Sequence, residues 1–433
     1  MSRMTVDRFA GLKALQPVER LPLSRCEPAS TLGALETEPA DCISDAATAS
    51  RKLALILGAS VKRNLHGEHL SLHCWHGHAP WIPDPKAMRL LAPEAPAEAV
   101  DAERWLFLDT ETTGLAGGTG TYPFLVGLAW WEGGGLEVEQ LFMREYSEEP
   151  SLLEALAERL AERPVLVTFN GKSFDWPLLE TRYRMTRSIP PPTPRAHLDF
   201  LHPARNIWRL RLGSVRLSQL ERHVLGWDRG ADLDSELIPG IYLDFMRGGN
   251  AEALIPVFHH NQMDLRGLAG LAGRILSLLG EAETTSPDGL ELYGISRICE
   301  RCGEHKRARK LYEQSISSRL PLEANRAAHL ALARLAKRDG DLARSRQLWE
   351  SMLGHSREGY EAYEQLAIYY EHRAREPRRA LAVAREALAQ LGCANLTGTI
   401  APAVCRRIQA RFEHRLARLE RKAGGTLLEP FSG

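Results

Sequence analysis

The chain has 433 residues, with 55 Lys and Arg against 55 Asp and Glu and 44% hydrophobic residues. That composition is typical of a soluble globular protein, and the length predicts two or three domains. No apolar run approaches the roughly 18 residues that span a bilayer. The first residues lack the apolar core of a secretory signal, and seven scattered cysteines do not indicate a disulfide framework. We therefore expect a cytoplasmic protein with no membrane segment.

Residues 1–50 mix Pro, Ser, Glu and Ala with weak periodicity and are predicted to be poorly ordered. Residues 51–102 are predicted to hold a short strand region and a Pro- and Ala-rich linker. A histidine cluster lies in that region: His66, His69, His73, His76 and His78, with Cys74 among them. A zinc site is disfavoured because the spacing matches no standard zinc ligand set. The alternation of polar and apolar residues from 69 to 75 indicates a half-buried strand instead, and the role of the histidines stays open.

The main domain, residues 103–282, is predicted to begin with an apolar strand over residues 104–110. Asp109 and Glu111 stand two residues apart at its end, so their carboxylates share one face. Two adjacent carboxylates next to a buried strand require a counter-charge. Hard oxygen ligands suit Mg²⁺ or Mn²⁺. The alternative is a strand end that enters an ordinary polar turn.

The glycine-rich stretch Ala116-Gly-Gly-Thr-Gly-Thr121 follows this strand. A phosphate-binding glycine loop would open a helix, whereas residues 122–131 read as a second strand. Glycines 133–135 then predict a hairpin into a third strand over 136–143. The stretch is therefore interpreted as a turn in an antiparallel meander, and a nucleotide-binding oxidoreductase is disfavoured.

The rest of the domain alternates helices and strands. Helices are predicted over 149–160, 176–185, 217–225 and 251–279, with strands over 165–170 and 197–201. Strands between helices indicate an α/β layer fold with three antiparallel strands plus further strands, flanked by helices. Asp175 falls at a strand-to-helix junction, and Asp264 lies within the last helix. His260 is four residues before Asp264 and so shares its helix face, whereas His259 is rotated away.

Residues 288–423 are predicted to form an all-α helical-repeat domain, followed by a tail at 424–433. The segment Arg309-Lys-Leu-Tyr-Glu recurs as Arg346-Gln-Leu-Trp-Glu, an offset of 37 residues. Such a period is typical of helical solenoids and resembles tetratricopeptide repeats. Residues 301–433 carry 25 Lys and Arg against 15 Asp and Glu. This excess fits phosphate binding or solvated helix faces, and the ligand of the repeats, a protein or a nucleic acid, stays open.

Four sequence blocks together resemble a known family. They are Leu108-Asp-Thr-Glu-Thr-Thr-Gly, Val167-Thr-Phe-Asn-Gly-Lys-Ser-Phe-Asp, His197-Leu-Asp-Phe-Leu-His-Pro-Ala-Arg and His260-Asn-x-x-Asp. Their order resembles the DEDD superfamily of 3′–5′ exonucleases, which has a ribonuclease-H-like fold. More closely, the blocks resemble YprB-like ribonuclease-H-like proteins, in which the nuclease domain can precede tetratricopeptide-like repeats. The resemblance spans residues 105–279.

The resemblance implies a hydrolase of nucleic acid. Its metal ligands would be four carboxylates, Asp109, Glu111, Asp175 and Asp264, which can hold two Mg²⁺ or Mn²⁺ ions about 3.5–4 Å apart. One branch of the superfamily places its base at the position of His259 and the other at that of His260. We favour His260 because it shares the helix face of Asp264.

Further residues are weaker candidates. Thr112, Gly114, Asn170 and Lys172 are candidate substrate contacts. The basic run Arg205, Arg209, Arg211 and Arg216 either tracks a nucleic-acid strand or forms a solvated face. Asp199 is expected to have a structural role.

The leading function is a metal-dependent 3′–5′ exonuclease. The alternative is a nucleic-acid-binding or scaffold protein with a catalytically weak nuclease fold and partner-binding repeats. DNA versus RNA, exonuclease versus endonuclease, and the oligomeric state stay open.

Overall fold

The computed structural model describes residues 53–77, 83–114, 118–230, 232–282, 287–354 and 357–425. The chain divides into two compact units, Met1–Thr285 and Ser286–Gly433. The predicted disordered segment 1–50 and residues 426–433 of the predicted tail lie outside the described residues. Among the residues that the structure describes, no helix combines the length and apolar composition that a membrane crossing requires.

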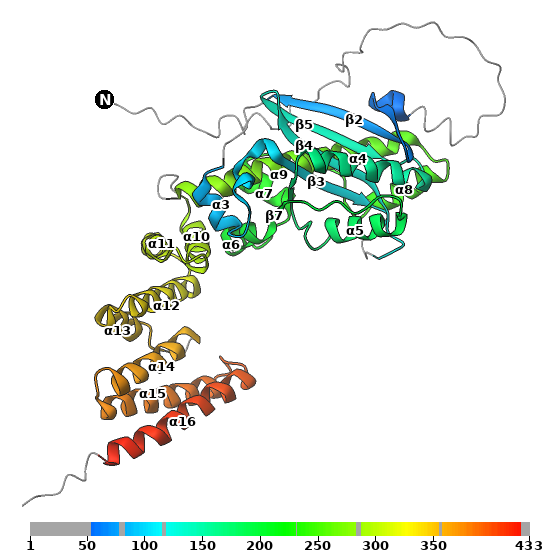
Figure 1. Cartoon of the computed structure of the whole chain (residues 1–433). Helices are drawn as coiled ribbons and strands as arrows, with labels where there is room; N and C mark the ends of the chain where they lie inside the picture. Colours follow the sequence, from blue (N-terminus) through cyan, green and yellow to red (C-terminus); the bar gives the residue numbers. More distant parts are fainter. Residues whose placement is uncertain are drawn as a thin grey trace, which may run out of the picture. The chain divides into compact units, whose positions relative to one another are not determined.

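The first unit is built on a mixed seven-stranded sheet in the order β1-β2-β5-β4-β3-β6-β7 (Figure 1). Strands β3 (Trp105–Thr112), β4 (Pro123–Glu132) and β5 (Gly135–Phe142) form the predicted antiparallel meander. Strands β6 (Val165–Thr168) and β7 (Ala196–Asp199) continue the sheet in parallel beyond β3. The glycine-rich stretch after β3 thus joins two antiparallel strands, which confirms its interpretation as a turn.

The opposite edge of the sheet differs from the sequence expectation. Strands β1 (Ser60–Asn64) and β2 (Gly67–Gly77) form a hairpin, and β2 pairs with β5, so this region belongs to the main sheet. Helix α3 (Pro85–Leu91) replaces part of the predicted linker, because three of its apolar side chains are buried. Pro and Ala content alone did not reveal that burial.

The strand predicted for the histidine cluster is confirmed as β2. His69 is buried and its Nδ1 lies 2.8 Å from Ser151 Oγ, whereas His73 is paired with Glu137 and Glu139. His78 lies outside the described residues. Among the residues that are described, the one group of three or more potential metal ligands lies elsewhere in the chain.

Helices cover both faces of the sheet. They are α4 (Glu149–Glu162), α5 (Asp175–Thr186), α6 (Leu201–Leu212), α7 (Leu217–Leu220), α8 (Ile238–Met246) and α9 (Ile255–Glu281). A π-helical turn, Glu221–Leu225, follows α7. Helix α9 packs on the face that carries Gln140, since the Gln140 amide donates to the Phe258 carbonyl at 2.8 Å. The neighbouring residue Glu139 points to the opposite face and bonds Arg159 of α4.

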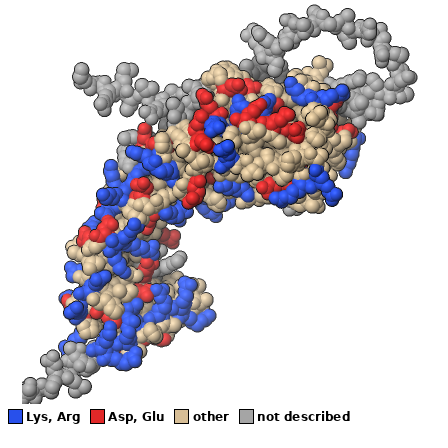
Figure 2. All heavy atoms as spheres, in the orientation of Figure 1, with Lys and Arg blue, Asp and Glu red and all other residues tan. Residues whose placement is uncertain are grey.

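The second unit contains helices throughout its described residues. They are α10 (Gly289–Arg301), α11 (His305–Ser317), α12 (Leu322–Arg338), α13 (Leu342–Ser351), α14 (Arg357–His372), α15 (Pro377–Leu396) and α16 (Pro402–Gly425). Gly303 and Gly340, 37 residues apart, follow the first helix of two successive pairs with positive φ of 82° and 83°. Figure 2 shows Lys and Arg spread over much of the visible face of this unit. The predicted fold, an α/β domain followed by a helical region, is confirmed, while the tetratricopeptide character stays a prediction.

Candidate active site

Strand β3 delivers the first two carboxylates. It runs two residues beyond the predicted end, so Glu111 lies inside the strand together with Asp109. Asp109 is paired across the sheet with Gly127 of β4, which in turn is paired with Gln140 of β5. These three residues form a row on the face covered by α9.

Asn261 of α9 fixes the Asp109 carboxylate from above this row. Its Nδ2 donates to Asp109 Oδ2 at 2.9 Å, and its Oδ1 accepts from Gln140 Nε2 at 2.9 Å. The Asn261 amide is fully buried, so both bonds are needed to satisfy it. A Cβ on Gly127 would lie 2.2 Å from Asn261 Oδ1. The missing side chain of Gly127 therefore makes room for the group that orients Asp109.

Asp175 begins α5 and reaches the same strand from another direction. Thr110 Oγ1 donates to Asp175 Oδ1 at 2.6 Å. Burial raises the pKa of Asp175 to about 6, although the bond from Thr110 opposes the rise. The bond from Thr110 holds the Asp175 carboxylate at β3, on the residue between Asp109 and Glu111. The Asp175 charge also helps to raise the pKa of Asp109 and of Glu111.

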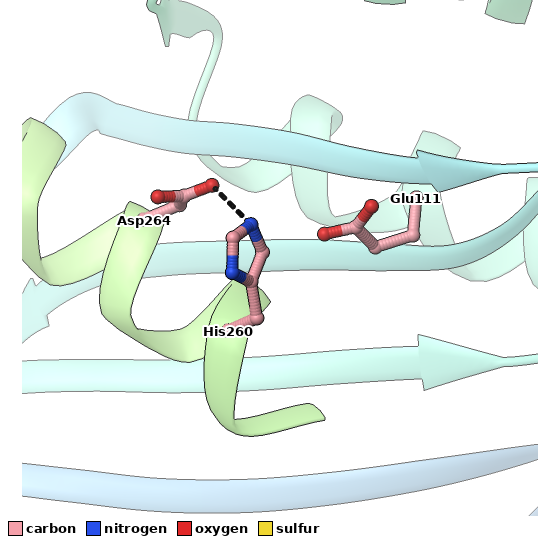
Figure 3. Close-up of side chains that lie close together, drawn as sticks. All are labelled: Glu111, His260 and Asp264. Carbon is pink, nitrogen blue, oxygen red and sulfur yellow. Dashed lines mark ion pairs between the residues drawn. The ribbon is translucent and has the colours of Figure 1, made fainter. Parts of the chain in front are cut away.

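Asp264 joins this group from α9, together with His260 (Figure 3). Ligand atoms of Glu111, His260 and Asp264 all lie within 4.8 Å of one another. The imidazole stands between the two carboxylates, with its Nε2 3.4 Å from Asp264 Oδ2. His260 is 6% exposed, whereas His259 is on the exposed side of α9.

Asp232 holds the other nitrogen of this imidazole. His260 Nδ1 lies 2.8 Å from Asp232 Oδ1. Burial disfavours the charged ring, but the bond to Asp232 and the charges of Asp264 and Glu111 raise the pKa of His260 to about 9. A bond from Nδ1–H to a carboxylate fixes the ring and leaves Nε2 facing Asp264 and Glu111.

Arg229 connects the same group to a further carboxylate, that of Glu221. Its guanidinium, 6% exposed, bonds Asp264, Glu221 and Asp232. Glu221 lies on the π-helical turn and is fully buried. Although burial opposes a charged guanidinium, Glu221 and Asp264 raise the pKa of Arg229 above its ordinary value. Arg229 thus fixes Asp264 while it neutralises Glu221.

Sequence reasoning missed these supporting residues. Residues 229–239 lie between the predicted helices 217–225 and 251–279 and have no predicted role, while Glu221 falls within the first of these helices. Asn261 was within a quoted motif, yet no role was assigned to it. The available signal was the acidic loop that surrounds Arg229, because a cation amid acidic residues indicates ion pairing.

Crowding makes the ionised state of the carboxylates costly. Burial, followed by the charges of Asp264, Glu111 and Asp175, raises the pKa of Asp109 well above its ordinary value. Burial also raises the pKa of Glu111 to about 8, together with the Asp264 charge and against the effect of His260. Clustered carboxylate oxygens of this kind match the ligand preference of Mg²⁺ and Mn²⁺. The donor set therefore fits divalent ions by its chemistry.

The candidate substrate contacts fall in different places. Asn170 adopts a left-handed conformation (φ 72°) and lines a cleft of about 510 Å³ together with Asp109 and Asp264. Thr112 Oγ1 donates to the Gly114 carbonyl at 2.9 Å. The Lys172 side chain is exposed. Among the residues described, neither Lys172 nor the Thr112–Gly114 pair lines that cleft.

Asp199 organises the turn that carries Asn170. Its carboxylate accepts from the backbone N–H groups of Asn170, Lys172 and Leu201, each at 3.0 Å. Three such bonds fix the loop between β6 and α5 against β7. The carboxylate thus has a structural role, as expected from the sequence.

Substitution of Arg229 tests how much this buried pairing contributes. Arg229→Met is expected to lower the free energy of unfolding by about 3 kcal/mol at pH 8, because it leaves Glu221 buried without a counter-charge. The matched control Arg184→Met breaks the exposed Arg184–Glu180 pair and should lower it by less than about 1 kcal/mol. Urea denaturation of both variants measures the difference. Equal losses would show that Arg229 is not a buried counter-charge.

The chain has detectable similarity to known proteins. Residues 106–276 match the model of a family within the RNase_H superfamily. The chain is 30% identical over 329 residues to the uncharacterized protein YprB of Bacillus subtilis (strain 168), and the match covers 75% of this chain and 76% of YprB. A solved structure of the family B DNA polymerase from the hyperthermophilic archaeon Pyrobaculum calidifontis matches at 16% identity and a TM-score of 0.34, over 46% of this chain and 29% of that one. The chain therefore belongs to the YprB family and carries an RNase H superfamily domain.

Proposed function

We propose that the protein is a metal-dependent nuclease that hydrolyses phosphodiester bonds from the 3′ end of a nucleic-acid strand. The observation that carries this proposal is the cluster of half-buried carboxylates on β3, α5 and α9, within an RNase H superfamily domain. A group of like charges with raised pKa values is typical of a functional site rather than of a structural core. The order of the four acidic motifs supports the 3′–5′ exonuclease class.

Four side chains would hold the divalent ions: Asp109, Glu111, Asp175 and Asp264. When bound, two Mg²⁺ or Mn²⁺ ions would supply an activated water and stabilise the leaving oxygen of the phosphodiester. The chain contributes the geometry. Asn261 and Thr110 orient Asp109 and Asp175, while Arg229 orients Asp264.

His260 is the proposed proton acceptor. In the neutral ring, the bond to Asp232 favours the tautomer with the proton on Nδ1, so Nε2 carries the free electron pair once the imidazolium has lost its second proton. Nε2 faces Asp264 and Glu111, where an attacking water would lose its proton. A carboxylate that fixes the tautomer of a histidine base is a recurring catalytic arrangement.

Removal of two metal ligands tests the enzyme assignment. Asp109→Asn combined with Glu111→Gln should reduce Mn²⁺-dependent digestion of 5′-labelled single-stranded oligonucleotides about a thousand-fold, which corresponds to about 4 kcal/mol in the barrier. EDTA should abolish wild-type digestion, and a blocked 3′ end should prevent it where a blocked 5′ end does not. Full digestion by the double variant would refute the carboxylate site. Binding without digestion by the wild type would instead support a non-catalytic nucleic-acid-binding protein.

The two adjacent histidines provide a matched pair of variants. His260→Gln is expected to reduce kcat about a hundred-fold or more, because general-base catalysis contributes on that scale. His259→Gln should change kcat less than about two-fold, since an exposed side chain on the other side of α9 cannot reach the carboxylates. The pH–rate profile of His260→Gln should also lose its rising limb. A larger effect at His259 would reverse the assignment.

Metal binding should stabilise the protein more at higher pH. Folded Glu111 keeps its proton up to a pKa of about 8, against 4.5 ordinarily, so the metal-free protein loses stability as pH rises through that window. His260 acts in the same direction, because its contribution is complete below its ordinary pKa of 6.5 and is lost as pH rises through about 9.

Mn²⁺ at 100 times its Kd should therefore add about 2.7 kcal/mol of stability at pH 8, with a smaller rise in Tm at the same concentration at pH 6. Thermal unfolding with and without Mn²⁺ measures both. In the control variant Glu111→Gln, the metal-dependent rise at pH 8 should shrink. A rise in Tm that is equal at both pH values would contradict the proposed ligand set.

A further inference from the structure

The cleft of about 510 Å³ beside the carboxylates has two chemically different sides. Asp109 and Asp264 line it from β3 and α9. Three arginines also line it, Arg205 and Arg209 from α6 and Arg216 from the residue before α7. The cleft thus places a cationic wall next to the proposed hydrolytic group.

The helix geometry explains why these arginines lie together. Arg205 and Arg209 are four residues apart on α6, so they occupy one face about one turn, or about 5.4 Å, from each other. The neighbouring face of α6 is buried through Ala204, Ile207 and Trp208, while Leu201, one turn before Arg205, lines the cleft with the arginines. Packing of that apolar face directs the two guanidinium groups to the cleft.

The three arginines differ from most others of this unit in their pairing. Arg144, Arg159, Arg182 and Arg229 each bond a carboxylate. Within the described part of the chain, by contrast, no carboxylate pairs with Arg205, Arg209 or Arg216, and all three are exposed. Three unneutralised guanidinium groups that line one cleft repel each other, so an anionic ligand would stabilise them.

The rest of the lining indicates which anion fits. Phe169, half-buried, lines the cleft beside Asn170. An aromatic ring beside a row of arginines is the combination that binds single strands, because bases stack while phosphates pair with the cations. The volume of about 510 Å³ is that of a small-ligand pocket and suits a short segment of single strand.

We propose that this cleft is the strand-binding subsite, in which Arg205, Arg209 and Arg216 bind backbone phosphates of a single-stranded polynucleotide next to the bond to be cut. This inference rests on the proposed nuclease function and adds the path of the substrate. The strand lies along α6, and the Phe169 ring contacts a base. Arg211 of the same basic run does not line the cleft and has its guanidinium on the His223 carbonyl.

Equilibrium binding separates this proposal from the catalytic one. Fluorescence anisotropy with a labelled 12-nucleotide single strand, as DNA and as RNA, is measured with Ca²⁺ in place of Mg²⁺ or Mn²⁺. The triple variant Arg205→Gln, Arg209→Gln and Arg216→Gln should raise Kd at least ten-fold on whichever strand the wild type binds more tightly. The slope of log Kd against log salt should fall by about 2, since each lost phosphate contact removes about 0.7.

A matched triple variant controls for net charge. Three exposed arginines of the same unit lie outside the cleft: Arg89, Arg184 and Arg195. Their joint replacement by Gln should shift Kd less than two-fold. Replacement of the three cleft arginines by Lys keeps the charge and should restore part of the affinity. Circular dichroism and Tm confirm that the variants fold.

The outcomes point in different directions for the two proposals. If the wild type cleaves the strand and the triple cleft variant binds it with the wild-type Kd, the strand site is overturned and the nuclease proposal stands. Cleft-dependent binding without cleavage would support the strand site and overturn the nuclease. Equal loss of affinity in both triple variants, or equally tight cleft-dependent binding of a blunt duplex, would overturn the single-strand subsite.

Discussion

The structure of the first unit depends on the cost of gathering acidic side chains beside a buried strand. Asp109 and Glu111 cannot leave that position, because β3 lies in the interior of the sheet between β4 and β6. Within the described residues, no ion pair with a lysine or arginine relieves the repulsion between these two carboxylates. Neutral groups contact the cluster instead: Asn261 donates to Asp109, and Thr110 donates to Asp175. The pKa values of Asp109 and Glu111 are therefore raised. A divalent ion bound among these carboxylates would reduce their repulsion.

Neutral donors leave the negative charge of Asp109 available to a metal ion, whereas a cationic side chain paired with Asp109 would neutralise that charge. The Gly127–Asn261 contact shows how closely the fold is adjusted to this arrangement, since even a methyl group on Gly127 would displace the amide. Charge compensation does occur one step away, where Arg229 pairs with Glu221 and one oxygen of Asp264. The second oxygen of Asp264 faces His260. One oxygen of Asp264 is thus paired with Arg229, while the other lies on the side of the site that holds His260 and Glu111.

The sequence predicted most of the strands and the acidic residues, because periodicity and local motifs determine them. Asp109, Glu111 and Asp264 each follow from a short pattern, and the structure brings them together. The edge strand itself was predicted, but its pairing with β5 is a non-local fact that a local pattern does not encode. Helix α3 was missed because Pro and Ala content does not reveal which side chains become buried. Arg229 and Asp232 were missed for a similar reason. A loop residue acquires a role only when folding carries it to α9, about thirty residues along the chain.

The contrast between two kinds of arginine completes the picture. Arg229 is buried and bonded to carboxylates, so its charge is spent within the fold. Arg205 and Arg209 are exposed, and no carboxylate of the described residues pairs with them, so their charge acts on whatever enters the cleft. A phosphodiester strand is repelled by bare carboxylates and attracted by these guanidinium groups. Under the proposed function, productive binding would require both the ions at Asp109 and Asp264 and the basic wall of α6, so strand affinity and metal affinity would reinforce each other.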